Sequence, residues 1–222
     1  MDYYLFAARS VTHAQRMARL LSDAGISAKI RRAGAAITER GCGYTLEIPR
    51  CHAARAMQQA DELLFRCRSA AAELFSVPSS EQVVFTMNAT HGLNIAIKSL
   101  VRPCGRVVVS GYEHNAVTRP LHALGAEVIV AAAPLFSPQE TVEAFERALA
   151  HEPDAVICTH VSNVFGAILP IERIAQLCRG ASVPLIIDAS QSAGSLPIDF
   201  SALAPAFLAM PGHKGLYGPQ GT

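Results

Sequence analysis

The sequence predicts an α/β protein, with a mostly parallel sheet covered by helices on both faces and a small α+β unit before it. From residue 51 onward, short runs rich in β-branched residues alternate with helical stretches. These runs are apolar throughout, as in strands that are buried on both faces. The first 50 residues follow another order, strand–helix–strand–strand. We therefore expect two domains, residues 1–50 and residues 51–222.

The first segment has clear start and stop signals for one helix. Thr12 and Gln15 have the spacing of a capping box, in which two side chains satisfy free backbone N–H groups at the start of a helix. Gly25 is typical of a helix end, because glycine readily adopts the left-handed conformation found there. The strands expected around this helix are Tyr3–Phe6, Ser27–Arg31 and Tyr44–Ile48.

The second segment begins with a long helix, Met57–Phe75, and continues as strand–helix repeats. Ser137, Pro138 and Glu140 together indicate the start of one of the later helices. Residues at helical spacing predict the buried side of the long helix: Leu63, Leu64, Cys67, Ala71 and Leu74. The expected strands are Val83–Thr86, Arg106–Ser110, Glu127–Ala132, Ala155–Thr159, Pro184–Asp188 and Phe207–Met210.

Composition excludes several classes of protein. Half of the 222 residues are hydrophobic, 17% are charged and the net charge is +1, unlike a disordered chain. No basic excess is available for phosphate contacts, so we expect no nucleic-acid partner. No apolar run reaches the roughly 18 residues of a membrane span, and the first residues do not resemble a secretion signal. We expect a cytoplasmic protein that does not associate with a membrane.

The six cysteines are predicted to be free thiols. None belongs to a C-x-x-C pair, so a zinc knuckle or a dithiol redox motif is not expected, and we predict no metal site. Cys158 and Cys178 stand in apolar stretches, which predicts that both are buried in the core.

Polar clusters follow five of the expected strands. In parallel α/β sheets, ligands bind at the carboxyl ends of the strands, so five such clusters predict one shared site. The clusters are Met87–Gly92, Glu113–Asn115, His160–Asn163, Asp188–Gln191 and Gly212–Gly215.

Taken in order, Glu113-His114-Asn115, Ser162-Asn163, Asp188-Ala189-Ser190-Gln191 and the run from Gly212 to Gly221 resemble the cysteine desulfurases. That group belongs to the class V aminotransferases, which are fold-type I enzymes dependent on pyridoxal 5'-phosphate (PLP). The resemblance extends from His52 to Thr222. It ends with the sequence just past Lys214, whereas the family continues into a part that supplies a carboxylate-binding arginine and a sulfur-accepting cysteine.

The resemblance implies PLP as the cofactor and a role for eight residues. Lys214 corresponds to the lysine that holds PLP as a Schiff base, and Asp188 to the acid that pairs with the pyridine nitrogen. His114 corresponds to a catalytic histidine that stacks on the pyridine ring. The residues implied to contact the cofactor are Ala89, Thr90, His114, Asn163, Asp188, Gln191, His213 and Lys214. Taken singly, each also fits an ordinary role, such as a turn aspartate, a helix cap or an exposed loop side chain.

Two positions depart from the family pattern. Pro211 stands where many members have a hydroxyl residue that contacts the phosphate, and His91 stands where an acidic residue is frequent. Residues 1–50 resemble instead a small family of sulfur or selenium carriers. In that comparison Cys42, between two glycines, is a possible carrier of persulfide sulfur, and a free loop cysteine is the alternative.

The resemblance implies a cysteine desulfurase that converts L-cysteine to alanine and leaves a persulfide, acting as a homodimer with a sulfur-acceptor protein as a further partner. Two alternatives stay open. One is a catalytically inactive fragment that serves as a sulfur or selenium carrier or as a partner protein, and the other is a selenocysteine lyase.

Overall fold

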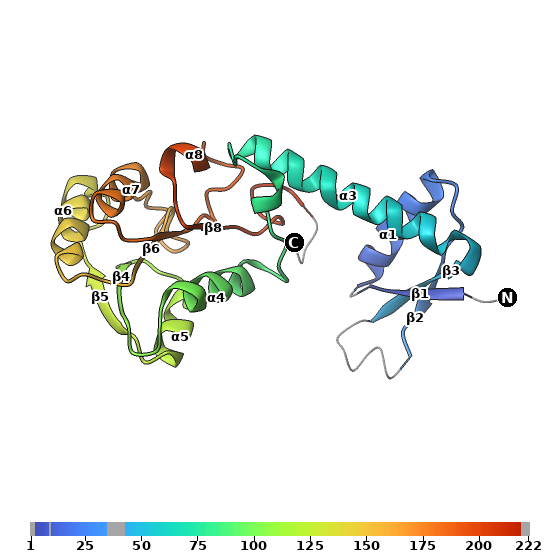
Figure 1. Cartoon of the computed structure of the whole chain (residues 1–222), viewed down its shortest axis with the longest axis horizontal. Helices are drawn as coiled ribbons and strands as arrows, with labels where there is room; N and C mark the ends of the chain where they lie inside the picture. Colours follow the sequence, from blue (N-terminus) through green and yellow to red (C-terminus); the bar gives the residue numbers. More distant parts are fainter. Residues whose placement is uncertain (1–2, 9, 35–42, 219–222) are drawn as a thin grey trace. The chain divides into compact units, whose positions relative to one another are not determined.

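The computed structural model describes residues 3–8, 10–34 and 43–218. The chain divides into two compact units, residues 1–70 and residues 71–222, which Figure 1 colours in order along the chain. Helix α3 (Ala53–Leu74) contributes residues to both. The domain boundary near residue 50 stays a prediction. Among the described residues, no helix has both the length and the apolar character needed to cross a bilayer.

The first unit is a three-stranded antiparallel sheet with one helix before its second strand. Its strands are β1 (Tyr3–Ala8), β2 (Lys29–Arg32) and β3 (Tyr44–Pro49), in the order β1-β3-β2, with α1 (Val11–Asp23) and the 3-10 turn η1 (Arg50–His52). The helix begins two residues earlier than predicted. Ser10 is extended, and its hydroxyl accepts a hydrogen bond from the His13 N–H at 3.2 Å. The capping box at Thr12 is therefore wrong, because Thr12 is already helical.

The core of the first unit is small and built from aliphatic side chains. Gly25 follows the end of α1 with a φ of +71°, as expected for a glycine that reverses the chain. The buried residues are Ala8, Ala14, Leu21, Ile26, Leu46, Ile48 and Ala56. The last of these belongs to α3, so the start of that helix packs on this sheet.

The middle of α3 is more exposed than its sequence predicts. Leu63, Leu64 and Leu74 are 45%, 47% and 59% exposed, and Cys67 is exposed as well. Ala71 is half-buried. The predicted burial is therefore wrong for the three leucines and Cys67, and Ala71 is buried only in part. A helical repeat of apolar residues defines a face but not the surface that covers it, and none of these residues belongs to the three buried clusters of the described chain.

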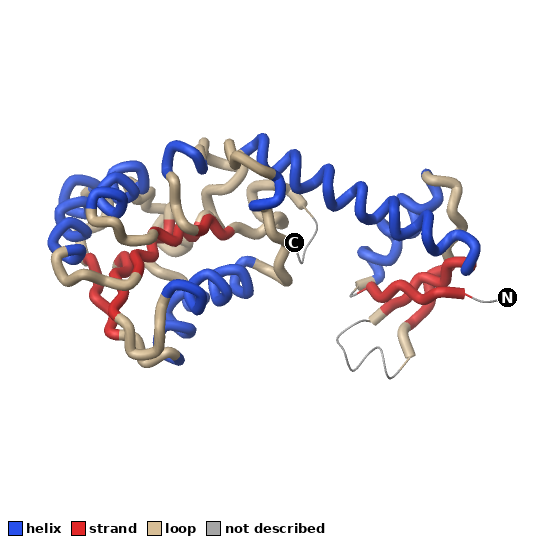
Figure 2. The backbone as a smooth tube through the Cα atoms, viewed as in Figure 1, coloured by secondary structure: helices blue, strands red, loops and turns tan. Residues whose placement is uncertain are grey.

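The second unit is a five-stranded parallel sheet in the order β5-β4-β6-β7-β8, which Figure 2 shows in red among blue helices. The predicted fold class is thus confirmed. The strands are β4 (Arg106–Ser110), β5 (Glu127–Ala131), β6 (Ala155–Thr159), β7 (Leu185–Asp188) and β8 (Phe207–Ala209). The helices are α4 (Ala89–Leu100), α5 (Asn115–Ala123), α6 (Pro138–Leu149), α7 (Ile171–Gly180) and α8 (Phe200–Leu203), with the 3-10 turn η2 (Ser80–Gln82).

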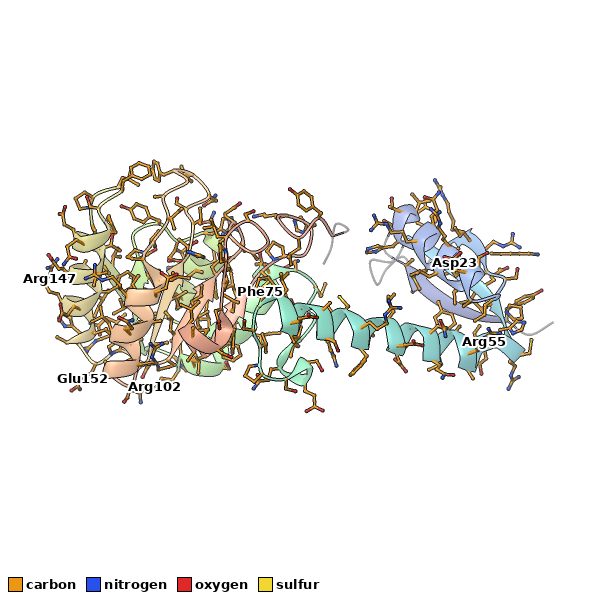
Figure 3. All side chains as sticks on the ribbon, turned by 90° about the horizontal axis from the view of Figure 1, so that it is seen from above. Asp23, Arg55, Phe75, Arg102, Arg147 and Glu152 are labelled. Atoms are coloured by element: carbon orange, nitrogen blue, oxygen red, sulfur yellow. The ribbon has the colours of Figure 1, made fainter. Side chains whose placement is uncertain are left out.

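Helices cover both faces of this sheet. Successive strand residues point to opposite sides, so neighbouring residues of one strand pack on different helices. Val107, Val109 and Ile157 pack with α4 and α5, whereas Val108 and Cys158 pack with α6 and α7. Figure 1 shows the two pairs of helices on opposite sides of the strands. Phe75, labelled in Figure 3, lies in the same core as α6 and α7 and anchors the end of α3 to this unit. Cys158 and Cys178 are buried, as predicted.

Two local predictions in this unit are wrong. Residues 83–86 form no strand, and Val84 is 72% exposed. A β-rich composition requires a neighbouring strand to pair with, and none is hydrogen-bonded to this segment in the described sheet. The Ser137 side chain makes no capping hydrogen bond. The Ser137 carbonyl instead accepts hydrogen bonds from the N–H and the hydroxyl of Thr141, so α6 starts without the predicted side-chain cap.

Candidate active site

Four of the five predicted polar clusters follow four adjacent strands. β4, β6, β7 and β8 are neighbours in the sheet, and Thr159, Asp188 and Ala209 lie side by side in its register. Since all of these strands are parallel, the residues that follow them gather at one carboxyl edge. The fifth cluster, residues 87–92, follows no strand and instead surrounds the start of α4.

The start of α4 lies at the same edge. The helix leads through a short loop into β4, so it runs opposite to the strands and its first turn lies beside their carboxyl ends. Asn88 caps it, with Oδ1 accepting from the His91 N–H at 2.8 Å. Ala89 and Thr90 are the first two helical residues, and their N–H groups have no carbonyl one turn back within the helix. Such a helix start favours an anionic group, including phosphate.

Asp188 is the last residue of β7 and is only 3% exposed. Its Oδ1 accepts a hydrogen bond from the Ser190 N–H at 2.9 Å, which fixes the turn after the strand. A buried carboxylate at the carboxyl edge of a parallel sheet is suited to pairing with a cationic group of a ligand, because burial strengthens electrostatic interactions.

The segment that contains Lys214 packs tightly on the turn after β7. A Cβ added to Gly194 would overlap the carbonyl group of Gly215, and one added to Gly215 would overlap the Ala193 carbonyl oxygen. Only glycine permits this approach of two backbones. The segment is also closed by a hydrogen bond from the Gly218 N–H to the Gly212 carbonyl, at 2.7 Å. Lys214 itself is exposed, as is His213.

His114 is fixed by a backbone contact. Its Nδ1 accepts a hydrogen bond from the Ala116 N–H at 3.0 Å and thereby caps the start of α5. Because an imidazole nitrogen that accepts a hydrogen bond carries no proton, the proton of the neutral ring is on Nε2. The side chain is otherwise exposed, and this leaves the ring available at the carboxyl edge.

Glu113 is a site residue that sequence reasoning missed. The sequence places it in the Glu113-His114-Asn115 motif but indicates no role for it. Its Oε1 accepts hydrogen bonds from the Ser110 hydroxyl and, at 2.8 Å, from the Thr159 N–H. Its Oε2 is buried and has no hydrogen-bond partner among the described residues. Burial, opposed by these hydrogen bonds and reinforced by the nearby charge of Asp188, raises the pKa of Glu113 from 4.5 to about 8.

This raised pKa predicts a pH-dependent stability. Between about pH 5 and pH 8 the folded chain keeps a proton on Glu113 that the unfolded chain has lost. The free energy of unfolding therefore falls as the pH rises through this window. We expect a fall on the order of 2 kcal/mol from this residue, less than the full pKa difference would give because the residue as a whole is only half-buried.

Urea unfolding of the wild type and of Glu113→Gln at several pH values tests this prediction. The amide keeps the size of the side chain but does not ionise, so the variant should gain stability relative to the wild type as the pH rises. The comparison cancels the contribution of His160, whose pKa is lowered by burial. Parallel stability profiles for the two proteins would show that Glu113 does not titrate in this window.

Several predicted residues are not tied into this arrangement. Asn163 and Gln191 are exposed side chains on the loops after β6 and β7. Cys42 lies outside the described residues.

Two shallow surface pockets, of about 350 and 310 Å³, contain neither Lys214 nor Asp188 in their walls. Within residues 3–8, 10–34 and 43–218, no three side chains of the metal-ligating types gather at one place.

Two solved structures with a similar fold are those of a cysteine desulfurase and of a C-DES mutant that carries PLP. An apo structure of the cysteine desulfurase from Thermococcus onnurineus NA1 has a TM-score of 0.67 at 26% identity, covering 75% of this chain and 42% of that one. A mutant of C-DES with glycine covalently linked to its PLP cofactor has a TM-score of 0.70 at 26% identity, covering 78% of this chain and 47% of that one. The second unit thus matches the large domain of these enzymes.

Sequence comparison points to the same family. The cysteine desulfurase IscS of Serratia proteamaculans (strain 568) is 35% identical over 170 residues, which are 73% of this chain and 41% of that protein. The chain therefore spans about two fifths of the length of the curated relatives that it matches. The model of the family described as aminotransferase class-V matches residues 20–222. The chain therefore belongs to the class V aminotransferase family.

Proposed function

We propose that the chain binds PLP and acts as a cysteine desulfurase, removing sulfur from L-cysteine to give alanine and a persulfide. One observation supports this most directly. The turn after β7, which follows the buried Asp188, and the segment with Lys214 touch through Gly194 and Gly215. The acid and the amine that PLP chemistry requires therefore come from two backbone segments in contact.

The donor groups at the carboxyl edge fit the three chemical parts of PLP. The amine of Lys214 would hold the aldehyde, the carboxylate of Asp188 would pair with the pyridine nitrogen, and the first turn of α4 at Ala89 and Thr90 would hold the phosphate. When bound, the cofactor supplies an electron sink for the bonds of the substrate α-carbon. His114, Asn163, Gln191 and His213 stand as further proposed contacts.

Residues of the chain itself would carry the proton transfer and accept the sulfur. Lys214 would hold and move a proton at its Nζ. A thiolate would attack the substrate sulfur, so that a sulfur–sulfur bond forms and the carbon–sulfur bond breaks; its electron pair stays on the carbon side, which takes up a proton to give alanine. Burial raises the pKa of the Cys178 thiol to about 12 and that of Cys158 well above its usual range, which makes both poor acceptors. Cys42 is the proposed carrier in this chain, acting within one molecule or between two.

A homodimer, a separate sulfur-acceptor protein and the use of selenocysteine in place of cysteine belong to the same proposal. They are inferred from the resemblance to the cysteine desulfurases. Relative rates with L-cysteine and L-selenocysteine would decide between desulfurase and selenocysteine lyase activity.

Alanine formation tests the proposal. The purified 222-residue chain, saturated with PLP, is expected to release alanine from L-cysteine, with sulfide appearing when a thiol reductant is present. Lys214→Ala should release none, whereas Lys98→Ala, which removes an exposed lysine of α4, should behave as the wild type does. If PLP binds but no alanine forms, the chain is not an enzyme by itself, and the carrier or partner function becomes the better account.

A further inference from the structure

The carboxyl group of Glu113 connects the ends of two neighbouring strands. Ser110, which ends β4, donates its hydroxyl hydrogen to Oε1, and Thr159, which ends β6, donates its backbone N–H to the same oxygen. The two donors come from strands that pair directly in the sheet. One side chain thus holds together the carboxyl ends from which the loops with His114 and Asn163 depart.

The two oxygens of this carboxyl group have unequal surroundings. Oε1 accepts two hydrogen bonds, whereas Oε2 is buried without a partner among the described residues. An ionised carboxylate shares its charge between both oxygens, and a buried charged oxygen without a hydrogen bond is costly. A neutral carboxylic acid fits this pattern better, with Oε1 as the carbonyl oxygen and the proton on Oε2.

Neighbouring charges act in the same direction. Asp188 of β7 acts on Glu113 with a like charge, and the buried thiol of Cys158 on β6 also interacts with it. His114, the next residue, directs its Nδ1 to the α5 backbone. Among the described residues, the groups that shift the pKa of Glu113 include no cation. Two adjacent buried carboxyl groups without a cation do not both ionise readily, so one keeps its proton.

We infer that Glu113 is a positioning residue that works as a neutral acid. It fixes the ends of β4 and β6, and through them the loops of His114 and Asn163, and leaves the pairing with the pyridine nitrogen to Asp188. This inference rests on the proposed PLP function for its purpose, but the protonation and the bridge are properties of the chain itself and can be measured without cofactor.

Infrared spectroscopy tests the protonation directly. The difference spectrum of the cofactor-free wild type minus Glu113→Gln at pH 6.5 is expected to contain the carbonyl stretch of a protonated carboxyl group, which disappears as the pH is raised toward 10. Glu143→Gln, at an exposed position of α6, is the matched control and should lack that band. A spectrum with only carboxylate bands for Glu113 at pH 6.5 would overturn the inference.

PLP binding, measured by absorbance titration at pH 7, tests the bridge. Glu113→Gln keeps an acceptor oxygen and is expected to bind within about threefold of the wild type, whereas Glu113→Ala should bind roughly 10-fold more weakly. Ser110→Ala, which removes one donor and creates little empty space, should shift affinity in the same direction but less, and it serves if Glu113→Ala does not fold. Equal affinities for the wild type, Glu113→Ala and Ser110→Ala would overturn the positioning role.

The two measurements separate the possible failures. If the wild type binds no PLP, the proposed function and the cofactor-positioning role both fail, while the infrared band still decides whether Glu113 is a neutral acid. If Glu113→Gln loses PLP as strongly as Glu113→Ala does, a charged carboxylate is required, and the inference is wrong even though the proposed function stands.

Discussion

Replacing Lys214 with alanine should abolish the specific attachment of PLP to this chain. The wild type mixed with PLP is expected to develop the visible absorbance of a lysine-bound cofactor, and borohydride reduction should fix the cofactor's mass on the peptide that contains Lys214. The covalent bond to the aldehyde requires an amine at that position. In Lys214→Ala the only remaining lysines are Lys29 and Lys98.

Those two lysines provide the control, because PLP also reacts weakly with exposed amines. Lys29 on β2 and Lys98 on α4 are both exposed. Peptide mapping after reduction should find the cofactor on Lys214 at equimolar PLP and on the other two only at large excess. Lys98→Ala should leave the absorbance unchanged. Labelling spread evenly over the three lysines, or an absorbance that survives in Lys214→Ala, would contradict the assignment of this residue.

The strands of the second unit show what the sequence alone could predict. β4 and β6 match the expected ranges residue for residue, because Val107, Val108 and Val109, like the residues of β6, form uninterrupted apolar runs. Strands buried on both faces can be recognised from the sequence alone, because nearly all of their residues are apolar. Residues 83–86 have a similar composition but no neighbouring strand to pair with. Pairing is a property of the whole sheet, so the local sequence could not reveal the difference.

The site residues likewise divide into those that the sequence could predict and those that it could not. Lys214 and Asp188 could be proposed from the sequence because each stands within a specific motif directly after an apolar run. The role of Glu113 could not, since it depends on a hydrogen bond to Thr159, which is 46 residues away in the chain. The buried side predicted for α3 is wrong for a related reason. Its apolar spacing is correct for a helix, but the surface that would cover Leu63 and Leu64 is not a property of the helix itself.

Replacing Gly194 tests the contact between the turn after β7 and the segment that contains Lys214. Its φ of +80° is strained for any residue with a side chain, and an added Cβ would overlap the backbone of Gly215. Gly194→Ala therefore has to move one segment away from the other. We expect the free energy of unfolding to fall by roughly 3 kcal/mol, from the backbone strain and the overlap together.

Gly166→Ala separates these two causes. Gly166 has a φ of +67°, but a Cβ added there meets no atom within 4 Å, so this variant should lose only the roughly 1 kcal/mol of backbone strain. Urea unfolding of both variants gives the difference, and PLP titration gives its consequence for the site. Gly194→Ala should weaken PLP binding because the segments of Asp188 and Lys214 are forced apart, whereas Gly166→Ala should not. Equal losses of stability in the two variants would mean that the two segments are not in close contact, and the main support for the proposed function would be lost.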